Sequence, residues 1–280
     1  MKRTDITSLG RPLDPDYPTN RAIGVVALVV LLGGLVWQRL SGAPWLDSAL
    51  WGARAGLTVF LAWALCRELD PDHPMAAFLA AGLALVALLA RGLPELTVIL
   101  WLLILLRVVN RTTGLPAGVL DVLGLVGLTG WLSLQGNWGY GLITSIALFL
   151  DSQLPDPARR QLLLALLSIV VTVVAAIVGE GFPQEAPSLM GGLLALGLSL
   201  LLLPVVLAAR SVDSGGDETG ERLTPSRVRA AQVLALLAGV ETAFVEGSSA
   251  FGTLAPLWAS VLGACFTWLY DNLISPGSAD

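Results

Sequence analysis

Apolar stretches of membrane-spanning length recur along this chain, and they restrict its fold more than any other feature. A hydrocarbon layer ~30 Å thick needs roughly 20 apolar residues in a helix to cross it. Hydrophobic residues make up 55% of the 280 residues and charged residues only 13%, whereas about 25% of a soluble domain is charged. The sequence therefore predicts an all-α polytopic integral membrane protein. The expected spans are 22–38, 48–66, 74–90, 94–109, 116–133, 137–150, 161–179, 187–209, 229–247 and 251–270.

The basic residues lie on every second connection between these stretches. With a cytoplasmic N-terminus, all of the 16 Lys and Arg residues except Arg39, Arg54 and Arg91 fall on the cytoplasmic side. Basic loops stay in the cytoplasm, and a miscount by one span would invert every later loop. The pattern predicts a bundle of about ten transmembrane helices with both termini cytoplasmic, in a prokaryotic inner or plasma membrane. The cytoplasmic set is Lys2, Arg3, Arg11, Arg21, Arg67, Arg107, Arg111, Arg159, Arg160, Arg210, Arg222, Arg227 and Arg229.

The same alternation divides the chain into five stretches. Gly and acidic residues dominate the one long polar insertion, and this composition favours a flexible segment. The stretches are a cytoplasmic tail over 1–21, an eight-helix membrane region over 22–209, a flexible cytoplasmic loop over 210–228, a final helix pair over 229–270, and a second tail over 271–280.

Two features predict irregular spans. The span over 137–150 reaches only roughly 21 Å at 1.5 Å per residue. The alternative is a re-entrant segment that does not cross the membrane. We keep 137–150 as a span, because a re-entrant segment would place Arg159 and Arg160 on the outer side of the membrane. Pro204 and Pro256 lie inside other spans, and each is expected to kink its helix because proline lacks a backbone N–H and so frees a carbonyl.

Composition excludes several classes of function. The formal net charge is −5, whereas a nucleic-acid-binding protein needs a basic patch. His73 is the only histidine, and neither Cys66 nor Cys265 has a Cys or His neighbour at metal-ligand spacing. We therefore expect a lipid bilayer as partner, with no nucleic acid, no metal, no cofactor and no assignable catalytic residue.

Four ionisable residues inside the spans are the candidates for function. A charge at the centre of a span costs about 2.5–3.5 kcal/mol on insertion scales, so each needs a partner or a role. Arg54 and Glu241 fall at similar depth from the outer side, Asp121 lies nearer the cytoplasm, and Glu246 is expected at the end of its helix. Our leading hypothesis is a transporter or permease-like protein that binds a small molecule or ion through Arg54, Asp121 and Glu241. The plainer alternative is a salt bridge between helices.

Two further functions fit the same sequence. Asp70 and Asp72 on one cytoplasmic loop, and Asp151 and Asp156 on another, could hold Mg²⁺ against a diphosphate. That arrangement would make a membrane-embedded enzyme acting on a lipid or prenyl phosphate, although Asp72 can equally cap the helix that begins at Pro74. A non-catalytic scaffold or complex subunit would need no polar site at all.

Glycines predict close contacts between helices. Gly52 and Gly56 form a G-x-x-x-G pattern, while Gly124, Gly127 and Gly130 lie roughly on one helix face. Small residues allow two helix backbones to approach closely in lipid. We expect tight packing within the chain, and either face could instead support an oligomer.

Overall fold

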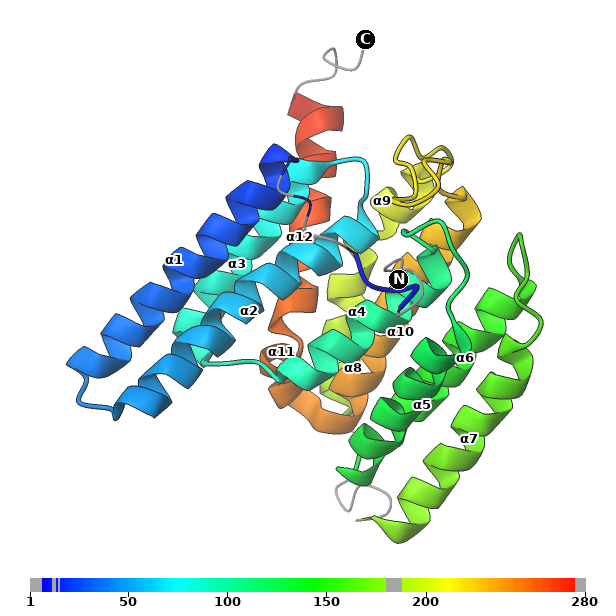
Figure 1. Cartoon of the computed structure of the whole chain (residues 1–280), viewed down its shortest axis with the longest axis horizontal. Coiled ribbons are helices and arrows are strands. Elements are labelled where there is room, and N and C mark those ends of the chain that lie inside the picture. Colours follow the sequence, from blue (N-terminus) through cyan, green and yellow to red (C-terminus); the bar gives the residue numbers. More distant parts are fainter. Residues whose placement is uncertain (1–6, 12–13, 15, 180–187, 275–280) are drawn as a thin grey trace. The chain divides into compact units, whose positions relative to one another are not determined.

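The structure is a computed structural model that describes residues 7–11, 14, 16–179 and 188–274. Within those ranges the chain is all-helical and contains no β-sheet (Figure 1). The structure confirms a helix in every predicted span. The chain divides into two compact units. Unit 1 comprises residues 1–11 and 100–250, and unit 2 comprises residues 12–99 and 251–280.

Unit 2 contains the first three helices and the last part of the chain. Prolines stand in the first turns of the first, third and last of its long helices, where their missing N–H is not needed. Its elements are α1 (Pro18–Leu40), α2 (Trp45–Leu69), α3 (Pro74–Arg91), α11 (Ala250–Thr253, which begins at the unit boundary), α12 (Ala255–Leu269) and the π-helical turn η3 (Tyr270–Ile274). A further helix, α4 (Leu96–Asn110), runs across the boundary from unit 2 into unit 1.

Small residues bring the helices of unit 2 together. A Cβ added to Gly56 of α2 would lie 2.7 Å from the backbone oxygen of Ala27 in α1, and one added to Gly52 would collide with the Leu31 backbone oxygen. The G-x-x-x-G face is therefore covered by α1 of the same chain. On another side of α2, buried Ala62 packs with alanines of α3 and α12. Close packing within the chain, predicted for these glycines, is confirmed.

Unit 1 contains most of α4 and the helices that follow it. Close contacts again occur at glycines, since a Cβ on Gly130 of α5 would lie 2.5 Å from Val171 of α7. By contrast, Gly124 and Gly127 of α5 have no atom within 4 Å of such a Cβ. The helices are α5 (Val119–Leu134), α6 (Gly139–Gln153), α7 (Gln161–Val178), α8 (Leu189–Leu200), α9 (Leu203–Ala208), α10 (Pro225–Glu246) and the 3₁₀ turn η2 (Gly247–Ser249).

Both internal prolines coincide with breaks in the helices. Turn residues separate α8 from α9 immediately before Pro204, and α11 ends just before the residues that lead to Pro256 in α12. The structure thus shows a break where a kink was predicted, and each proline sits in the first turn of the following helix. A proline at that position removes no intrahelical hydrogen bond.

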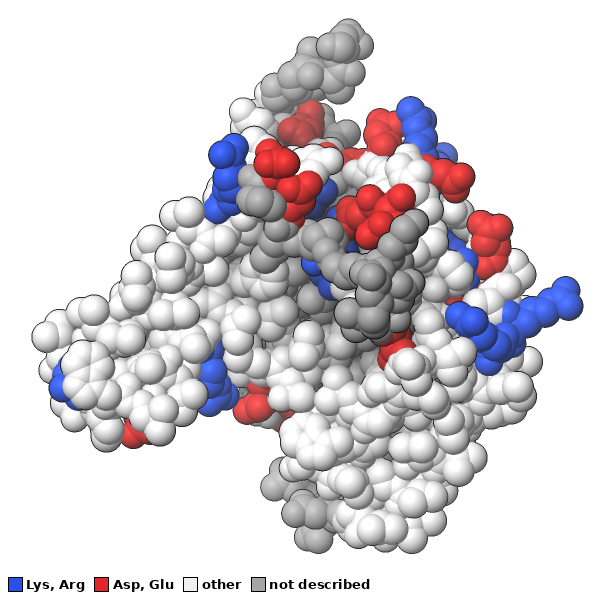
Figure 2. Space-filling model, in the orientation of Figure 1, with Lys and Arg blue, Asp and Glu red and all other residues white. Residues whose placement is uncertain are grey.

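Five described helices are long and apolar enough to cross a membrane: α1, α2, α3, α7 and the run Pro225–Thr253 that starts with α10. Shorter apolar helices accompany them, among them α4, α5 and α8. Large hydrophobic side chains lie on the surface, for example Leu89 of α3 at 73% exposure and Ile177 of α7 at 77%. Most of the surface visible in Figure 2 likewise carries no charged group. Such a surface is typical of membrane association, because soluble monomers rarely expose large apolar patches.

The polar stretch before α10 folds into a small hairpin. The backbone N–H of Leu223 donates to the oxygen of Ser214, and Val212 and Leu223 pack against Val228 of α10. The N–H of Asp217 also donates to the oxygen of Thr112, after α4. The segment that we expected to be a flexible loop thus makes defined contacts with unit 1.

Candidate functional site

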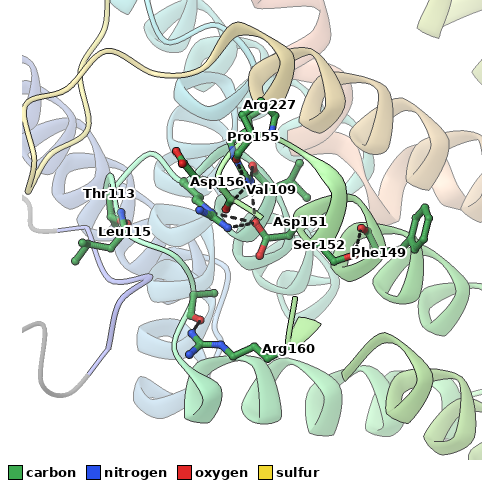
Figure 3. A network of polar contacts seen from close by, with 12 residues as sticks. Val109, Thr113, Leu115, Phe149, Asp151, Ser152, Pro155, Asp156, Arg160 and Arg227 are labelled. Atoms are coloured by element: carbon green, nitrogen blue, oxygen red, sulfur yellow. Dashed lines mark hydrogen bonds and ion pairs between the residues drawn. The ribbon is translucent and has the colours of Figure 1, made fainter. Parts of the chain in front are cut away.

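A buried ion cluster joins three segments of unit 1. Arg111 donates from Nε to Oδ1 of Asp151 at 3.0 Å, and Arg227 donates from Nη1 to the same oxygen at 2.7 Å. The Asp151 side chain is fully buried and that of Arg227 is 3% exposed. Arg227 also donates to the backbone oxygens of Val109 and Pro155 (Figure 3). The cluster therefore fastens the end of α4 and the α6–α7 loop to the first turn of α10.

This cluster includes a carboxylate from one of the acidic loops that were predicted to hold Mg²⁺. Oδ1 of Asp151 is occupied by two guanidinium groups, and exposed Asp156 offers its backbone oxygen to Arg227. Asp70 instead lies in unit 2, where it contacts His73. Among the described residues, no three His, Cys, Asp or Glu side chains are grouped so that they could hold a metal ion. The enzyme hypothesis gains no support from these carboxylates.

A second polar layer connects α4, α5 and α6. The indole Nε1 of Trp101 donates to Oγ1 of Thr129 at 3.1 Å and to Oγ1 of Thr144 at 3.0 Å. The two hydroxyl oxygens are 2.9 Å apart, and all three residues are buried. The Trp101 ring also meets the edge of the Tyr140 ring at 5.0 Å between centroids. Every polar atom named here has a partner, so this layer is structural.

The third polar group lies where the end of α10 meets the start of α6, and it differs from the other two. The Tyr140 hydroxyl donates to Oε1 of Glu246 at 2.9 Å. One turn earlier, Oε2 of Glu241 lies 3.4 Å from the Thr242 hydroxyl. Its other oxygen, Oε1, is buried and has no hydrogen-bond partner in the described part of the chain. A Cβ on Gly139 would collide with this oxygen.

Asn137 completes this third group. Its side chain is 6% exposed, and its Oδ1 accepts a hydrogen bond from the Gly139 N–H at 2.9 Å. Its amide faces the Tyr140 hydroxyl, while Nδ2 makes no hydrogen bond to the described residues. We call Asn137, Tyr140, Glu241 and Glu246 the Glu241 group. It combines a buried carboxyl oxygen and a buried amide nitrogen, neither of which meets hydrogen-bond geometry with another of the described residues.

Asp121 is held by the N-terminal segment. The backbone N–H and the hydroxyl of Ser8 donate to its Oδ2 at 2.7 and 2.6 Å. Arg107 donates to the Leu9 backbone oxygen, and Arg11 forms an ion pair with Asp217 of the hairpin. Residues 8–11 therefore dock against unit 1. The first six residues of the predicted tail lie outside the described residues.

The structure separates two of the three residues that we predicted to bind substrate together, Asp121 and Glu241. Asp121 stands in the first turn of α5, whereas Glu241 contacts Gly139, beyond the other end of that helix. Along α5 this amounts to roughly 20 Å at 1.5 Å per residue. Arg54 belongs to unit 2, where it is exposed on α2. Of the predicted set, only Glu241 lies in the third polar group.

The only histidine lies in the loop between α2 and α3. Nδ1 of His73 is 2.7 Å from Oδ1 of Asp70, and Nε2 is 3.8 Å from Oδ2 of Asp271 in η3. The hydrogen bond to Asp70 raises the pKa of His73, and partial burial opposes this shift. The loop thus carries a pH-sensitive contact within unit 2.

Tyr140 and Asn137 were not among the predicted site residues. Neither carries a charge at neutral pH, so neither stands out in an apolar span as Glu241 does. The available signal was that both fall at the start of the short span over 137–150, which is polar for a membrane segment.

Comparison with models of protein families, with curated proteins and with solved structures found no match to this chain.

Proposed function

We propose that the protein is a multi-pass protein of a prokaryotic inner or plasma membrane with about ten spans and both termini cytoplasmic. The apolar helices and their exposed hydrophobic surfaces support membrane insertion. The alternation of basic loops supports the orientation, since basic loops stay in the cytoplasm. In this topology the α6–α7 loop and the hairpin before α10 face the cytoplasm, and the Glu241 group lies toward the outer side.

We further propose a transporter or permease-like activity centred on the Glu241 group. The observation that carries this proposal is the buried Oε1 of Glu241, which has no hydrogen-bond partner in the described part of the chain. Ionisable groups within membrane spans mark substrate or ion pathways and proton relays. The proposed site contains fewer residues than the set predicted from sequence, because Asp121 is hydrogen-bonded to Ser8.

The topology is tested by labelling single introduced cysteines with a membrane-impermeant maleimide in intact cells. The native Cys66 and Cys265 are buried, so they give little background. Ser41→Cys, between α1 and α2, should be labelled from outside, and Thr219→Cys, in the hairpin, should be labelled only after the membrane is opened. Labelling of both positions from the same side would reject the proposed orientation.

The activity is tested with the full chain in vesicles that contain an entrapped pH dye. After a pH gradient is imposed, the wild-type protein should dissipate it faster than protein-free vesicles do. E241Q should slow the dissipation at least tenfold, whereas E218Q should not, because Glu218 is exposed in the hairpin. Equal rates in wild-type and protein-free vesicles would reject this activity.

A further inference from the structure

We propose that the species bound by the Glu241 group is a proton, carried by the Glu241 carboxyl group itself. This inference rests on the proposed function and names its substrate or coupling species. Binding converts the Glu241 carboxylate into a carboxyl group by taking one proton from hydronium, which leaves water. Release returns the proton to water, and neither direction needs a further reactant.

The space around the Glu241 carboxyl group suits a proton. Oε1 of Glu241 is buried and lies where Gly139 has no side chain, so closely that a Cβ there would collide with it. The space beside Gly139 is therefore filled by the Glu241 carboxyl oxygen and the glycine backbone. A metal cation would need several oxygen ligands around an open centre. A proton needs only the oxygen.

The charges of the neighbouring side chains also favour a proton on Glu241. On α6, the titratable residue that faces Glu241 is Tyr140, and on α10 it is Glu246. The described elements α8, α9 and η2, which also pack against α10, contain no titratable side chain. The charged hairpin packs against α10 at Val228, near the other end of that helix. Asp151 of α6 lies at the opposite end of that helix with Arg111 and Arg227. Unit 1 thus supplies no positive charge beside Glu241 in its described part.

A buried carboxylate without a positive partner is costly, and the group avoids this cost by binding a proton. A second carboxylate nearby increases the cost, since two like charges in one site disfavour each other. Glu246 is on the same helix and accepts the Tyr140 hydrogen bond. Of the two acids, Glu241 is therefore the one that should hold the proton.

Uncharged polar atoms beside the Glu241 carboxyl group are placed to stabilise its deprotonated state. Asn137 is 6% exposed, faces the Tyr140 hydroxyl, and its Nδ2 makes no hydrogen bond to the described residues. An amide donor that is left unsatisfied in a dry interior is destabilising. It becomes satisfied when an oxygen of the group turns toward it as the proton leaves. Asn137 is thus a positioning residue for the deprotonated state.

The inference is tested by infrared spectroscopy of the full chain in nanodiscs. A buried protonated carboxyl group gives its own carbonyl-stretch band, which shifts in deuterated water and disappears as the pH is raised. We expect this band in the wild-type protein near neutral pH. It should be lost in E241Q and unchanged in the exposed control E218Q. In E246Q it should be kept but disappear at lower pH, because the neighbouring negative charge is removed. Asn137→Ala should move its disappearance to higher pH.

Several outcomes would overturn the inference. A wild-type protein without a deuterium-sensitive carboxyl band near neutral pH has no such proton, and this measurement does not depend on any variant folding. A band that is lost in E246Q and kept in E241Q would show that Glu246, and not Glu241, carries the proton. A band abolished by added NaCl, but not by choline chloride, assigns the site to a metal cation. Vesicles that show no flux while the band behaves as expected reject transport and leave the proton site intact.

Discussion

Arg227 donates from Nη1 to Oδ1 of Asp151 at 2.7 Å, and this bond joins the first turn of α10 to the last turn of α6. The two residues are 76 positions apart in the sequence. Arg111 binds the same oxygen. The single negative charge of Asp151 is therefore shared between two buried guanidinium groups. Removing it leaves both guanidinium groups without their anion.

We therefore predict that Asp151→Asn destabilises the protein by about 3 kcal/mol, because breaking a buried ion pair costs ~3–5 kcal/mol. The measurement is the midpoint of thermal unfolding of the purified protein in detergent. The control is Asp213→Asn, which removes an ion pair with Arg222 whose side chains are 76% and 81% exposed. Exposed pairs contribute roughly 0–1 kcal/mol. Equal midpoints for both variants would show that the Asp151 cluster does not stabilise the fold.

A second prediction concerns the contact between α1 and α2. Gly52→Ala places a methyl group against the backbone oxygen of Leu31, and a backbone cannot move aside as a side chain can. Overpacking of this kind costs roughly 1–3 kcal/mol, so the variant should lower the unfolding midpoint. Gly33→Ala is the matched control, since a Cβ there meets nothing within 4 Å. It should leave the midpoint equal or higher, because alanine favours helix over glycine by about 1 kcal/mol.

The same pair of variants separates folding from assembly. If Gly52 served an oligomer interface, G52A would change the oligomeric state on size-exclusion chromatography while the unfolding midpoint of the monomer stayed constant. We expect the opposite result, because α1 of the same chain occupies this face.

The helices could be predicted from the sequence because their signals are local. An apolar run of sufficient length specifies a membrane helix without knowledge of its neighbours. Proline fixes where a helix restarts, as Pro204 and Pro256 do here. Glu241 could be recognised as a candidate for the same reason, since a charge within an apolar run is visible in the run itself.

The partners of the polar residues could not be predicted, because they depend on which helices meet. Ser8 and Asp121 are 113 positions apart, and nothing in either segment indicates the other. Arg111 and Arg227 were explained by topology as basic cytoplasmic loop residues, a pattern that carries no information about pairing. Tyr140 and Asn137 are neutral, so only the packing of α6 against α10 shows that they belong beside Glu241.

A third prediction follows from the pKa of His73. The hydrogen bond to Asp70 raises this pKa above its ordinary value of about 6.5. A raised folded-state pKa means that the contact contributes its full stability below about pH 6.5 and loses it as the pH rises through the higher folded value. The unfolding midpoint of wild type should therefore fall across that window relative to His73→Gln, which does not titrate.

The effect should be small, because His73 is 45% exposed and solvent screens its charge. Asp70→Asn provides the internal check, since it removes the charged acceptor that raises the pKa of His73. In that variant the fall of the midpoint should be smaller and should end at lower pH, because the folded-state pKa of His73 is no longer raised by Asp70. Parallel pH curves for wild type and His73→Gln would contradict the prediction.

A fourth prediction concerns the N-terminal segment docked on unit 1. Two hydrogen bonds from Ser8 reach Oδ2 of Asp121, and the Ser8 hydroxyl oxygen also accepts from the Gly118 N–H at 2.7 Å. Ser8→Ala removes the hydroxyl and leaves the backbone bond. A hydrogen bond to a charged group contributes about 1.5–3 kcal/mol, so the docked state should weaken by roughly tenfold or more.

Hydrogen–deuterium exchange measures this docking directly, because the backbone N–H groups of residues 8–11 become accessible when the segment detaches. Exchange there should accelerate by about tenfold or more in S8A and remain unchanged in Ser41→Ala, where the lost hydroxyl bonds only within its own exposed helix end. Asp121→Asn should accelerate exchange in the same segment, since it removes the charged acceptor from both Ser8 bonds. If exchange of this segment is as fast in wild type as in S8A, the segment is not docked in solution, and Asp121 becomes available as a free carboxylate at the start of α5.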